Sequence, residues 1–425
     1  MSGPATPDPA SDPDGIPETE AGSGMAALRH RDFALFLIGR GPAGGLVNMG
    51  MVAVAYQIYD FTGDALNLAY IGLAMFGPAI VFALFTGYVA DTVDRRLIAL
   101  VTMGIQIVAA LLFYVVAAMG MPVVWPMYVI IVLLGSGRSF FNAAMNSYVP
   151  SLVPREDFAN AMAWHQAAVK TAQVTGPALG GVLYLLGPEV VYLTMAGIMS
   201  VCLVLLFMIR TRMPVRPRKA PDLETLLAGL HYILEKRIIL GAITLDMFVV
   251  LMGGVTALIP IFARDILDVG PSGAGFMRST FAIGGIVAAV AMTHVTLTRH
   301  AGLVLFVCVI IFGLCTIAFA LSPYFFLTLV ALAVMGAADV VSVCIRLTLL
   351  QILTPDDMMG RVIAVNSIFT GTSNEIGEFR AGVFAAWLGG VGAALVGGVG
   401  AILVAGVIWR IFPELARIQR LDRPV

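Results

Sequence analysis

The stretch GYVADTVDRR at residues 87–96 lies between two long apolar segments, and it decides the fold of this chain. Gly87 is expected to end a helix and to let another backbone approach closely. Asp91 can accept charge-assisted hydrogen bonds from the positive N-terminus of a neighbouring helix. Arg95 and Arg96 stand where lipid would give way to cytoplasm, which would fix the orientation of both flanking helices. The spacing G-x-x-x-D-x-x-D-R-R therefore predicts a tight cytoplasmic loop between two membrane helices.

The composition agrees with an all-α membrane protein. Of the 425 residues, 59% are hydrophobic and only 12% are charged, whereas soluble proteins carry about 25% charged residues. The net charge of −1 gives no basic surface for nucleic acid. No phosphate-binding loop, nucleophile elbow or metal-ligand spacing occurs, so the sequence predicts neither an enzyme nor a cofactor or metal site. The cysteines lie in apolar runs and are expected to be small core residues: Cys202, Cys308, Cys315 and Cys344.

Apolar segments long enough to cross a bilayer, about 20 residues each, follow one another along most of the chain. The tail at residues 1–24 is rich in Pro, Asp, Glu, Gly and Ser, so it is expected to be disordered and is no signal peptide. We expect two six-helix bundles at 25–210 and 238–412, a linker at 211–237 and a cytoplasmic tail at 413–425. The twelve expected spans are 33–58, 67–90, 97–120, 124–147, 158–186, 189–210, 238–262, 272–296, 302–321, 323–347, 361–388 and 390–412.

The linker is Pro-rich and basic in its first half. Its second half, with Asp222 as a possible N-cap, is typical of a short amphipathic helix with one apolar face made of Leu223, Leu226, Leu227, Leu230 and Ile233. Basic residues gather in this linker, after span 2 and after span 12, whereas the loops near 60–66 and 187–189 carry only acids. Arg264 is the main exception. This asymmetry predicts that both termini are cytoplasmic.

The two halves of the chain repeat one another at an offset of 201 residues, without a gap. The matching pairs are Gly135 and Gly336, Arg138 and Asp339, Pro154 and Pro355, His165 and Asn366, Gly176 and Gly377, and Gly181 and Gly382. Repeats of this kind in membrane proteins are related by an axis along the membrane normal. The pattern therefore predicts two similar bundles side by side.

With this loop, these spans and this repeat, the chain resembles the major facilitator superfamily of membrane transporters along nearly its whole length after residue 25. The stretches LRHRDF at 28–33 and VPSLVPRED at 149–157, with Gly39 and Arg40, resemble the subgroup that holds the enterobactin exporter and the macrolide-efflux proteins. The resemblance implies two six-helix bundles that work by alternating access, and proton antiport where a mechanism is assigned in the subgroup.

The resemblance also gives the loop a role. In the superfamily it latches the two halves together on the cytoplasmic side, and the residues that carry this role here are Gly87, Asp91, Asp94, Arg95 and Arg96. The alternative is an ordinary basic turn without a gating role.

Charged residues at membrane depth are costly and are therefore candidates for function. Span 4 carries Arg138 with Asn142 one turn later, and span 10 carries Asp339 at the matching position. The resemblance implies that spans 1, 4, 7 and 10 line a central cavity, so Arg138 and Asp339 are expected to face each other across it. The alternative for both is a local contact that orders the helices.

Span 1 adds Arg40 and Asn48 to the candidate cavity residues, and span 7 carries Asp246 at a depth comparable with that of Arg40. Arg40 either pairs with Asp246 as a cytoplasmic-side gate or snorkels to the membrane interface.

Span 5 carries Gln166, Lys170 and Gln173 at helical spacing. The run that follows resembles the span-5 motif of antiporters, which are exporters, although Ala172 replaces its first glycine. The motif residues here are Gly176, Pro177, Gly180 and Gly181. Glycine and proline at these positions kink a helix and allow close packing, which is also the alternative explanation of the run.

Span 11 carries Glu375 and Glu378 within one turn. Two glutamates so close in a membrane helix do not both stay ionised without nearby cations, so the pair suits a proton carrier. Lys170 is the expected cross-helix partner, and Asp339 is the next candidate for the proton. The alternative is an ion-pair cluster that only holds the helix together.

These patterns support the hypothesis of a proton-coupled exporter of small organic molecules in the bacterial inner membrane, acting as a monomer within the lipid bilayer. Its expected partners are a small-molecule substrate and protons, and no nucleic acid. An importer or a lipid flippase on the same fold, or a non-transporting membrane sensor or assembly protein, remain the alternatives.

Overall fold

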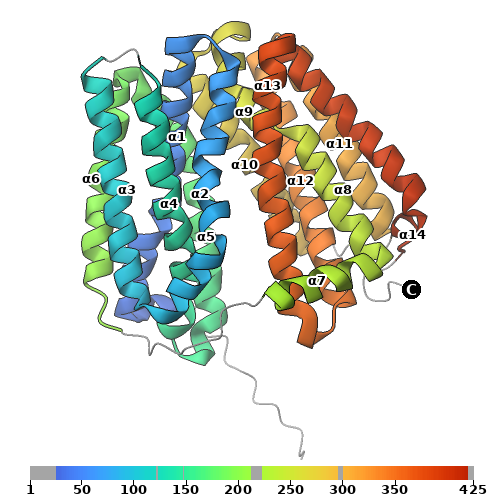
Figure 1. Cartoon of the computed structure of the whole chain (residues 1–425), viewed down its shortest axis with the longest axis horizontal. Coiled ribbons are helices and arrows are strands. Elements are labelled where there is room, and N and C mark those ends of the chain that lie inside the picture. Colours follow the sequence, from blue (N-terminus) through green and yellow to red (C-terminus); the bar gives the residue numbers. More distant parts are fainter. Residues whose placement is uncertain (1–24, 121–122, 147, 212–222, 295–299, 420–425) are drawn as a thin grey trace, which may run out of the picture.

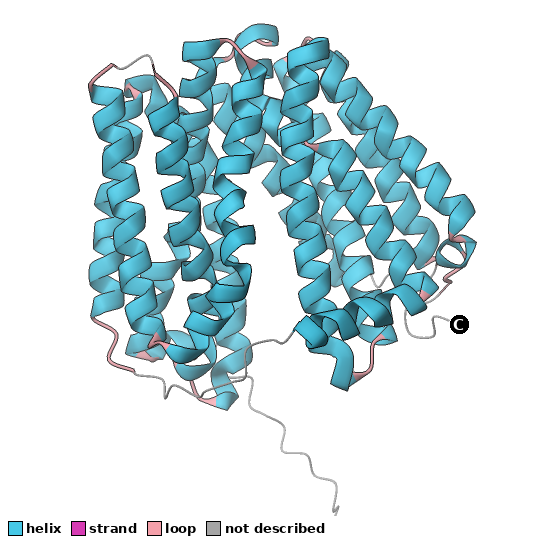
Figure 2. Ribbon diagram, in the orientation of Figure 1, coloured by secondary structure: helices cyan, strands magenta, loops and turns pink. Residues whose placement is uncertain are grey.

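The computed structural model describes residues 25–120, 123–146, 148–211, 223–294 and 300–419, and for some residues inside the helices it describes the backbone alone. All regular elements in these ranges are helices (Figure 2). They form two groups that lie side by side, one from each half of the chain (Figure 1). The predicted tail at 1–24, the first half of the linker and the end of the C-terminal tail lie outside the described residues.

The first half consists of six long helices: α1 (Arg31–Thr62), α2 (Ala65–Thr92), α3 (Arg95–Ala118), α4 (Trp125–Asn146), α5 (Phe158–Leu183) and α6 (Pro188–Phe207). Short polar side chains begin two of them. Asp64 Oδ1 accepts a hydrogen bond from Leu66 N at 2.9 Å, and Asp94 Oδ1 accepts one from Arg96 N at 2.9 Å. Such N-caps satisfy backbone donors that have no partner inside the helix.

The second half begins with the linker helix α7 (Leu223–Glu235), which is followed by α8 (Arg237–Gly253), α9 (Val255–Ile261), a π-helical turn (Phe262–Ile266), α10 (Gly270–His294), α11 (Ala301–Leu321), α12 (Phe325–Leu353), α13 (Asp356–Ile411) and α14 (Pro413–Ala416). Helix α13 is broken at Gly389, where φ is 74°. This break lies between the two last predicted spans.

The predicted span 238–262 differs from the structure, because Gly254 interrupts it with φ 57° and separates α8 from α9. Two conditions require glycine there. The backbone is left-handed, and a Cβ would lie 2.8 Å from the Cβ of Ala381 on α13. The sequence alone showed neither condition.

Seven helical segments of the described chain are long and apolar enough to cross a membrane: Arg95–Ala118, Pro188–Phe207, Arg237–Ile266, Gly270–Met292, Ala301–Leu321, Phe325–Leu353 and Met358–Ile411. Leucine and valine side chains stand exposed around these helices, as expected where lipid is the solvent. The chain is thus an all-helical membrane protein.

The repeat positions make matching contacts in the two halves. Gly135 on α4 lies against the backbone of Met75 on α2, and Gly336 on α12 lies against the backbone of Phe281 on α10. Small residues let helix backbones approach closely where the membrane offers no hydrophobic driving force.

The two halves meet along α5 with α10 and along α2 with α13. Polar contacts between them gather at the end away from α7: the Tyr59 hydroxyl donates to Asp265, and Arg264 Nη1 donates to the carbonyl of Tyr59 at 2.8 Å. Arg264 also lies 3.3 Å from Asp60. Towards α7 the two groups of helices stand apart (Figure 1).

The segment between the halves is attached at both ends. Thr211 donates to Asp32 Oδ2 through its backbone N at 2.8 Å and its Oγ1 at 2.6 Å. On the other side, α7 packs on the second half: Ile233 is 1% exposed, and the Tyr232 hydroxyl donates to the carbonyl of Leu353 at 2.7 Å. The linker helix therefore belongs to the second half.

Candidate functional site

A cavity lies between the two halves, and it has three lobes of about 640, 360 and 140 Å³ that share lining residues. Asn48 on α1 lines all three. Arg278 on α10 lines the two larger ones. The volumes of the two larger lobes are typical of sites for small organic molecules.

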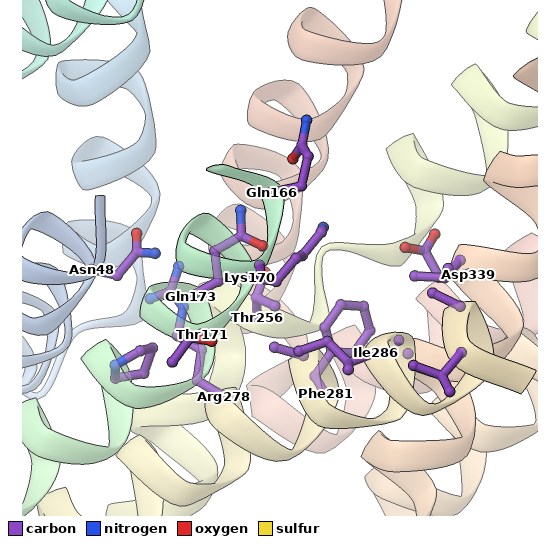
Figure 3. Close-up of a pocket in the computed structure, with 18 residues that line it drawn as sticks. Asn48, Gln166, Lys170, Thr171, Gln173, Thr256, Arg278, Phe281, Ile286 and Asp339 are labelled. Carbon is purple, nitrogen blue, oxygen red and sulfur yellow. The ribbon is translucent and has the colours of Figure 1, made fainter. Parts of the chain in front are cut away.

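The largest lobe lies between α5, α10 and α12 (Figure 3). Helix α5 supplies Lys170 with Gln166 and Gln173, which are all exposed to the open space. Asp339 of α12 stands on the opposite side of this lobe. Apolar side chains, among them Phe281 and Ile286, complete the wall.

The second lobe holds the two acids of α13, Glu375 and Glu378. Thr256 Oγ1 donates to Glu378 Oε1 at 2.8 Å. Helix α2 of the other half comes close here, because a Cβ at Gly72 would lie 3.7 Å from Glu375 Oε2. The carboxylates thus face a space that both halves enclose.

Two arginines share this lobe with the acids. Arg138 of α4 and Arg278 of α10 both line it, and both act electrostatically on Glu375. The expected partner Lys170 lies in the largest lobe instead. Nearby cations favour the ionised form of a carboxylate, whereas an apolar wall favours the protonated form, so a carboxyl group that meets both can exchange a proton.

Arg138 and Asp339 line different lobes of the cavity, and neither is among the charges that act on the other. The charges of Glu375, Arg278 and Glu378 act on Arg138, and Arg138 acts in turn on Arg40. The offset of 201 residues pairs the two positions in the sequence repeat, but positions paired in this way need not touch.

Arg40 occupies the smallest lobe together with Asn142 and Arg138. Its Nη2 donates to Asn142 Oδ1 at 3.0 Å, and its guanidinium lies 5.0 Å from the ring centroid of Phe141. The Arg40 side chain is 7% exposed, so it does not snorkel to an interface. Helix α1 directs it at α4, which supplies both an amide and an aromatic face.

The expected pair of Arg40 and Asp246 does not form here. Asp246 of α8 instead forms an ion pair with Arg346 of α12, and their side chains are 9% and 3% exposed. Thr370 Oγ1 lies 3.5 Å from Asp246 Oδ2. This contact joins three helices of the second half, and a buried ion pair that loses one partner leaves a costly unpaired charge.

The loop predicted at residues 87–96 is shorter in the structure, because α2 continues to Thr92 and α3 begins at Arg95. Asp94 caps α3, and Arg96 donates to the carbonyl of Phe207 at the end of α6, 5.3 Å from the centre of the Phe207 ring. Arg95 lies in the first turn of α3. The expectation that Gly87 ends a helix was wrong, since Gly87 falls within α2. Asp91 falls within α2 as well, and its side chain is outside the described part of the chain.

The antiporter-like run of α5 lies where this helix packs on two neighbours. A Cβ at Gly176 or Gly180 would meet the backbone of α1 at Gly45 or Met49. A Cβ at Gly181 would lie 3.0 Å from the Cα of Gly275 on α10. Pro177 lies inside the helix and directs its carbonyl at Gly275. The run therefore packs α5 closely on α1 of its own half and on α10 of the other half.

Sequence reasoning missed Arg278, which lies inside the predicted span 272–296. The cost of a charge at membrane depth, already used for Arg138, would have identified it. It also missed the contact of Tyr59 with Asp265, for which the sequence gives no signal, since the two residues are far apart in the chain.

Known proteins resemble the chain over most of its length. The family described as "Transmembrane secretion effector" matches residues 22–423. The enterobactin exporter EntS of Shigella dysenteriae serotype 1 is 27% identical over 350 residues, which cover 80% of this chain and 82% of that protein. EntS of Salmonella typhi is also 27% identical, over 80% of this chain and 83% of its own.

Solved structures share the fold at low identity. A mutant form of the nucleoside transporter NupG has a TM-score of 0.71 at 13% identity, over 90% of this chain and 100% of its own. A bacterial homologue of the iron transporter ferroportin in an inward-facing state has a TM-score of 0.69 at 17% identity, over 91% and 99% of the two chains.

Proposed function

The chain belongs to the transmembrane secretion effector family of the major facilitator superfamily, and on that premise we propose that it is a proton-coupled exporter of small organic molecules. The family and the relatives named above are transporters rather than enzymes. The relatives named EntS export enterobactin, so a siderophore-like or drug-like molecule is the proposed class of substrate.

The proposed topology has twelve spans in the bacterial inner membrane, with both termini in the cytoplasm. Two observations support this count: α13 is broken at Gly389, and α8 with α9 and the following turn forms one apolar segment. The basic residues of the linker support a cytoplasmic position for α7. Because the halves stand apart at the α7 end and contact each other at the other end, we interpret this conformation as an inward-open state.

The pair of Glu375 and Glu378 is the observation that carries proton coupling. These acids lie on the cavity wall where α13 faces α2 of the other half, so their surroundings change when the halves move. A group whose surroundings change with conformation binds its proton differently in the two states, and that difference is what couples a proton to transport. Arg138 and Arg278 are the cations that tune this exchange.

Everted membrane vesicles with an acidic lumen test the proposal, with enterobactin and erythromycin as the probes. We expect the parent protein to concentrate at least one probe in the lumen, and a protonophore to abolish this accumulation. The double variant Glu375→Gln and Glu378→Gln should lose accumulation and keep downhill exchange, because substrate binding does not need the proton. Normal accumulation by the double variant would show that the proton moves elsewhere.

The same vesicles distinguish the other functions. Accumulation only in right-side-out vesicles would indicate import, and movement of a labelled phospholipid alone would indicate a flippase. A protein that moves no probe in either orientation would be a sensor or an assembly protein.

A further inference from the structure

The largest lobe of the cavity contains two cations that no carboxylate of the described chain neutralises by direct contact. Lys170 and Arg278 both line it, and neither forms an ion pair with a described acid. Asp339 acts on Lys170, and Glu375 acts on Arg278, through the electric field without an ion pair. The neighbour of Asp339, Arg346, is already paired with Asp246. A site with unpaired cations in reach of a ligand favours a negatively charged group.

The rest of the lobe is suited to an apolar body with a few polar groups. Phe281, Ile286 and Val340 line one part, and the amides of Asn48, Gln166 and Gln173 line another. The volume of about 640 Å³ holds a ring system of drug-like size. Amides donate and accept hydrogen bonds, so they accommodate hydroxyl or carbonyl groups without selecting a charge.

The two cations come from different halves of the molecule, because Lys170 lies on α5 and Arg278 lies on α10. We infer that this lobe binds amphipathic organic anions, with the acidic group between Lys170 and Arg278 and the apolar body against Phe281 and Ile286. This inference rests on the proposed transport function and names the class of its substrate. An anion held from both halves also links them to each other.

Three naphthalene probes with one shared body test the charge preference: 2-naphthoate, 2-naphthalenemethanol and 2-naphthylmethylamine. Their binding to the purified protein in nanodiscs is measured by calorimetry, with empty nanodiscs as the reference. We expect the anion to bind about tenfold or more tightly than the alcohol and the amine, since a charge-assisted contact is worth roughly 1.4 kcal/mol or more. Equal affinity for the three probes, or no binding of naphthoate, would overturn the inference.

Variants locate the site. Lys170→Gln and Arg278→Gln should each weaken naphthoate binding about tenfold and leave the alcohol unchanged. Lys170→Arg should keep most of the affinity, and Lys236→Gln, an exposed lysine beside α8, is the matched control. Thermal unfolding of each variant shows that it is folded. If naphthoate binds Lys170→Gln and Arg278→Gln as it binds the parent, this lobe is not the anion site.

These measurements use no proton gradient, so they fail independently of the proposed function. Anion binding without gradient-driven movement would refute the exporter and leave the binding class standing. Gradient-driven movement of a neutral or cationic probe, with no preference for naphthoate in binding, would refute the anion site and leave the exporter function standing.

Discussion

The two contacts between the halves occupy equivalent places in the repeat, yet they are chemically different. Along α5 and α10 the contact is made by backbone: Gly181 lies against Gly275, and Ser279 Oγ donates to the carbonyl of Val174 at 2.6 Å. Along α2 and α13 the equivalent contact carries acids, because Glu375 and Glu378 face Gly72.

The repeat offset of 201 residues shows which residues of the α5–α10 contact correspond to the two glutamates of the α2–α13 contact. The residues 201 positions before Glu375 and Glu378 are Val174 and Pro177, whose carbonyls contact α10. One copy of the repeat thus offers neutral backbone groups for close packing, and the other offers side chains that can bind a proton. We interpret the first contact as the site about which the halves pivot and the second as the site that senses protons.

Among the variants that test this difference, Gly275→Ala should cause the largest loss of transport. The new Cβ would meet the carbonyl of Pro177 and would lie 3.1 Å from the Cα of Gly181, and neither backbone can move aside as a flexible side chain could. Overpacking of this kind costs about 1–3 kcal/mol, and here it also separates the halves. We expect transport in vesicles to fall to background, with a lower midpoint of thermal unfolding.

Gly72→Ala is the matched control at the other contact. Its Cβ would have only ordinary contacts, with Glu375 Oε2 at 3.7 Å and Glu378 Cβ at 3.8 Å. It should therefore keep most of its transport. Equal loss in both variants would remove the distinction between a pivot and a proton site.

The single variants Glu375→Gln and Glu378→Gln should have the second-largest effect. Each removes one acid of a coupled pair, so the remaining acid titrates alone. We expect gradient-driven accumulation to fall by about tenfold, roughly 1.4 kcal/mol of coupling free energy, while downhill exchange changes little. Flux measured against and along an imposed gradient in proteoliposomes separates the two quantities. A parallel loss of both would indicate a role in binding.

Tyr59→Phe should weaken a third contact between the halves, at the end away from α7. This contact lies outside the α5–α10 and α2–α13 contacts. The variant loses the hydrogen bond from the Tyr59 hydroxyl to the Asp265 carboxylate. A bond to a charged group contributes about 1.5 kcal/mol, so the ratio of inward-open to outward-open molecules should fall by roughly tenfold or less. Spin-label distances between the ends of α1 and α10 report this ratio. No change would mean that Arg264 alone holds this end.

Asp32→Asn should have the smallest effect, since it touches neither contact between the halves. Burial raises the pKa of Asp32, but hydrogen bonds from Thr211 and Arg210 and the charge of Arg31 outweigh it, so the pKa lies below its ordinary value of 3.8. The stabilisation is then complete above that ordinary value and is lost as the pH falls through the lower pKa of the folded protein.

The variant should lose about 1 kcal/mol of unfolding free energy at neutral pH and show a weaker dependence of stability on acid. Thermal unfolding in detergent between neutral and acidic pH measures both quantities. Its transport at neutral pH should equal that of the parent, and a larger loss would give Asp32 a part in movement of the halves.

The sequence predicted elements well where one local rule decides them. The break in α13 falls at Gly389, between the spans 361–388 and 390–412, and the apolar face of α7 buries Ile233 as expected. The partners of charged residues were harder to predict, because each depends on the distance between helices far apart in the chain. Arg40 meets Asn142, and Asp246 meets Arg346, for that reason. A charged residue inside a predicted span can be recognised from the sequence as a candidate for function, but the residue that it contacts cannot.

Thr211 is attached to Asp32 of the first half, and α7 is attached to the second half. The number of residues between these two attachments therefore limits how far apart they can lie. Twelve peptide steps separate Thr211 from Leu223, and a fully extended chain advances about 3.6 Å per step. The two attachment points can therefore never be more than about 43 Å apart. This segment sets an upper limit on the separation of the two halves at the α7 end, so the width of an opening there is bounded by chain length and not only by the shape of the cavity.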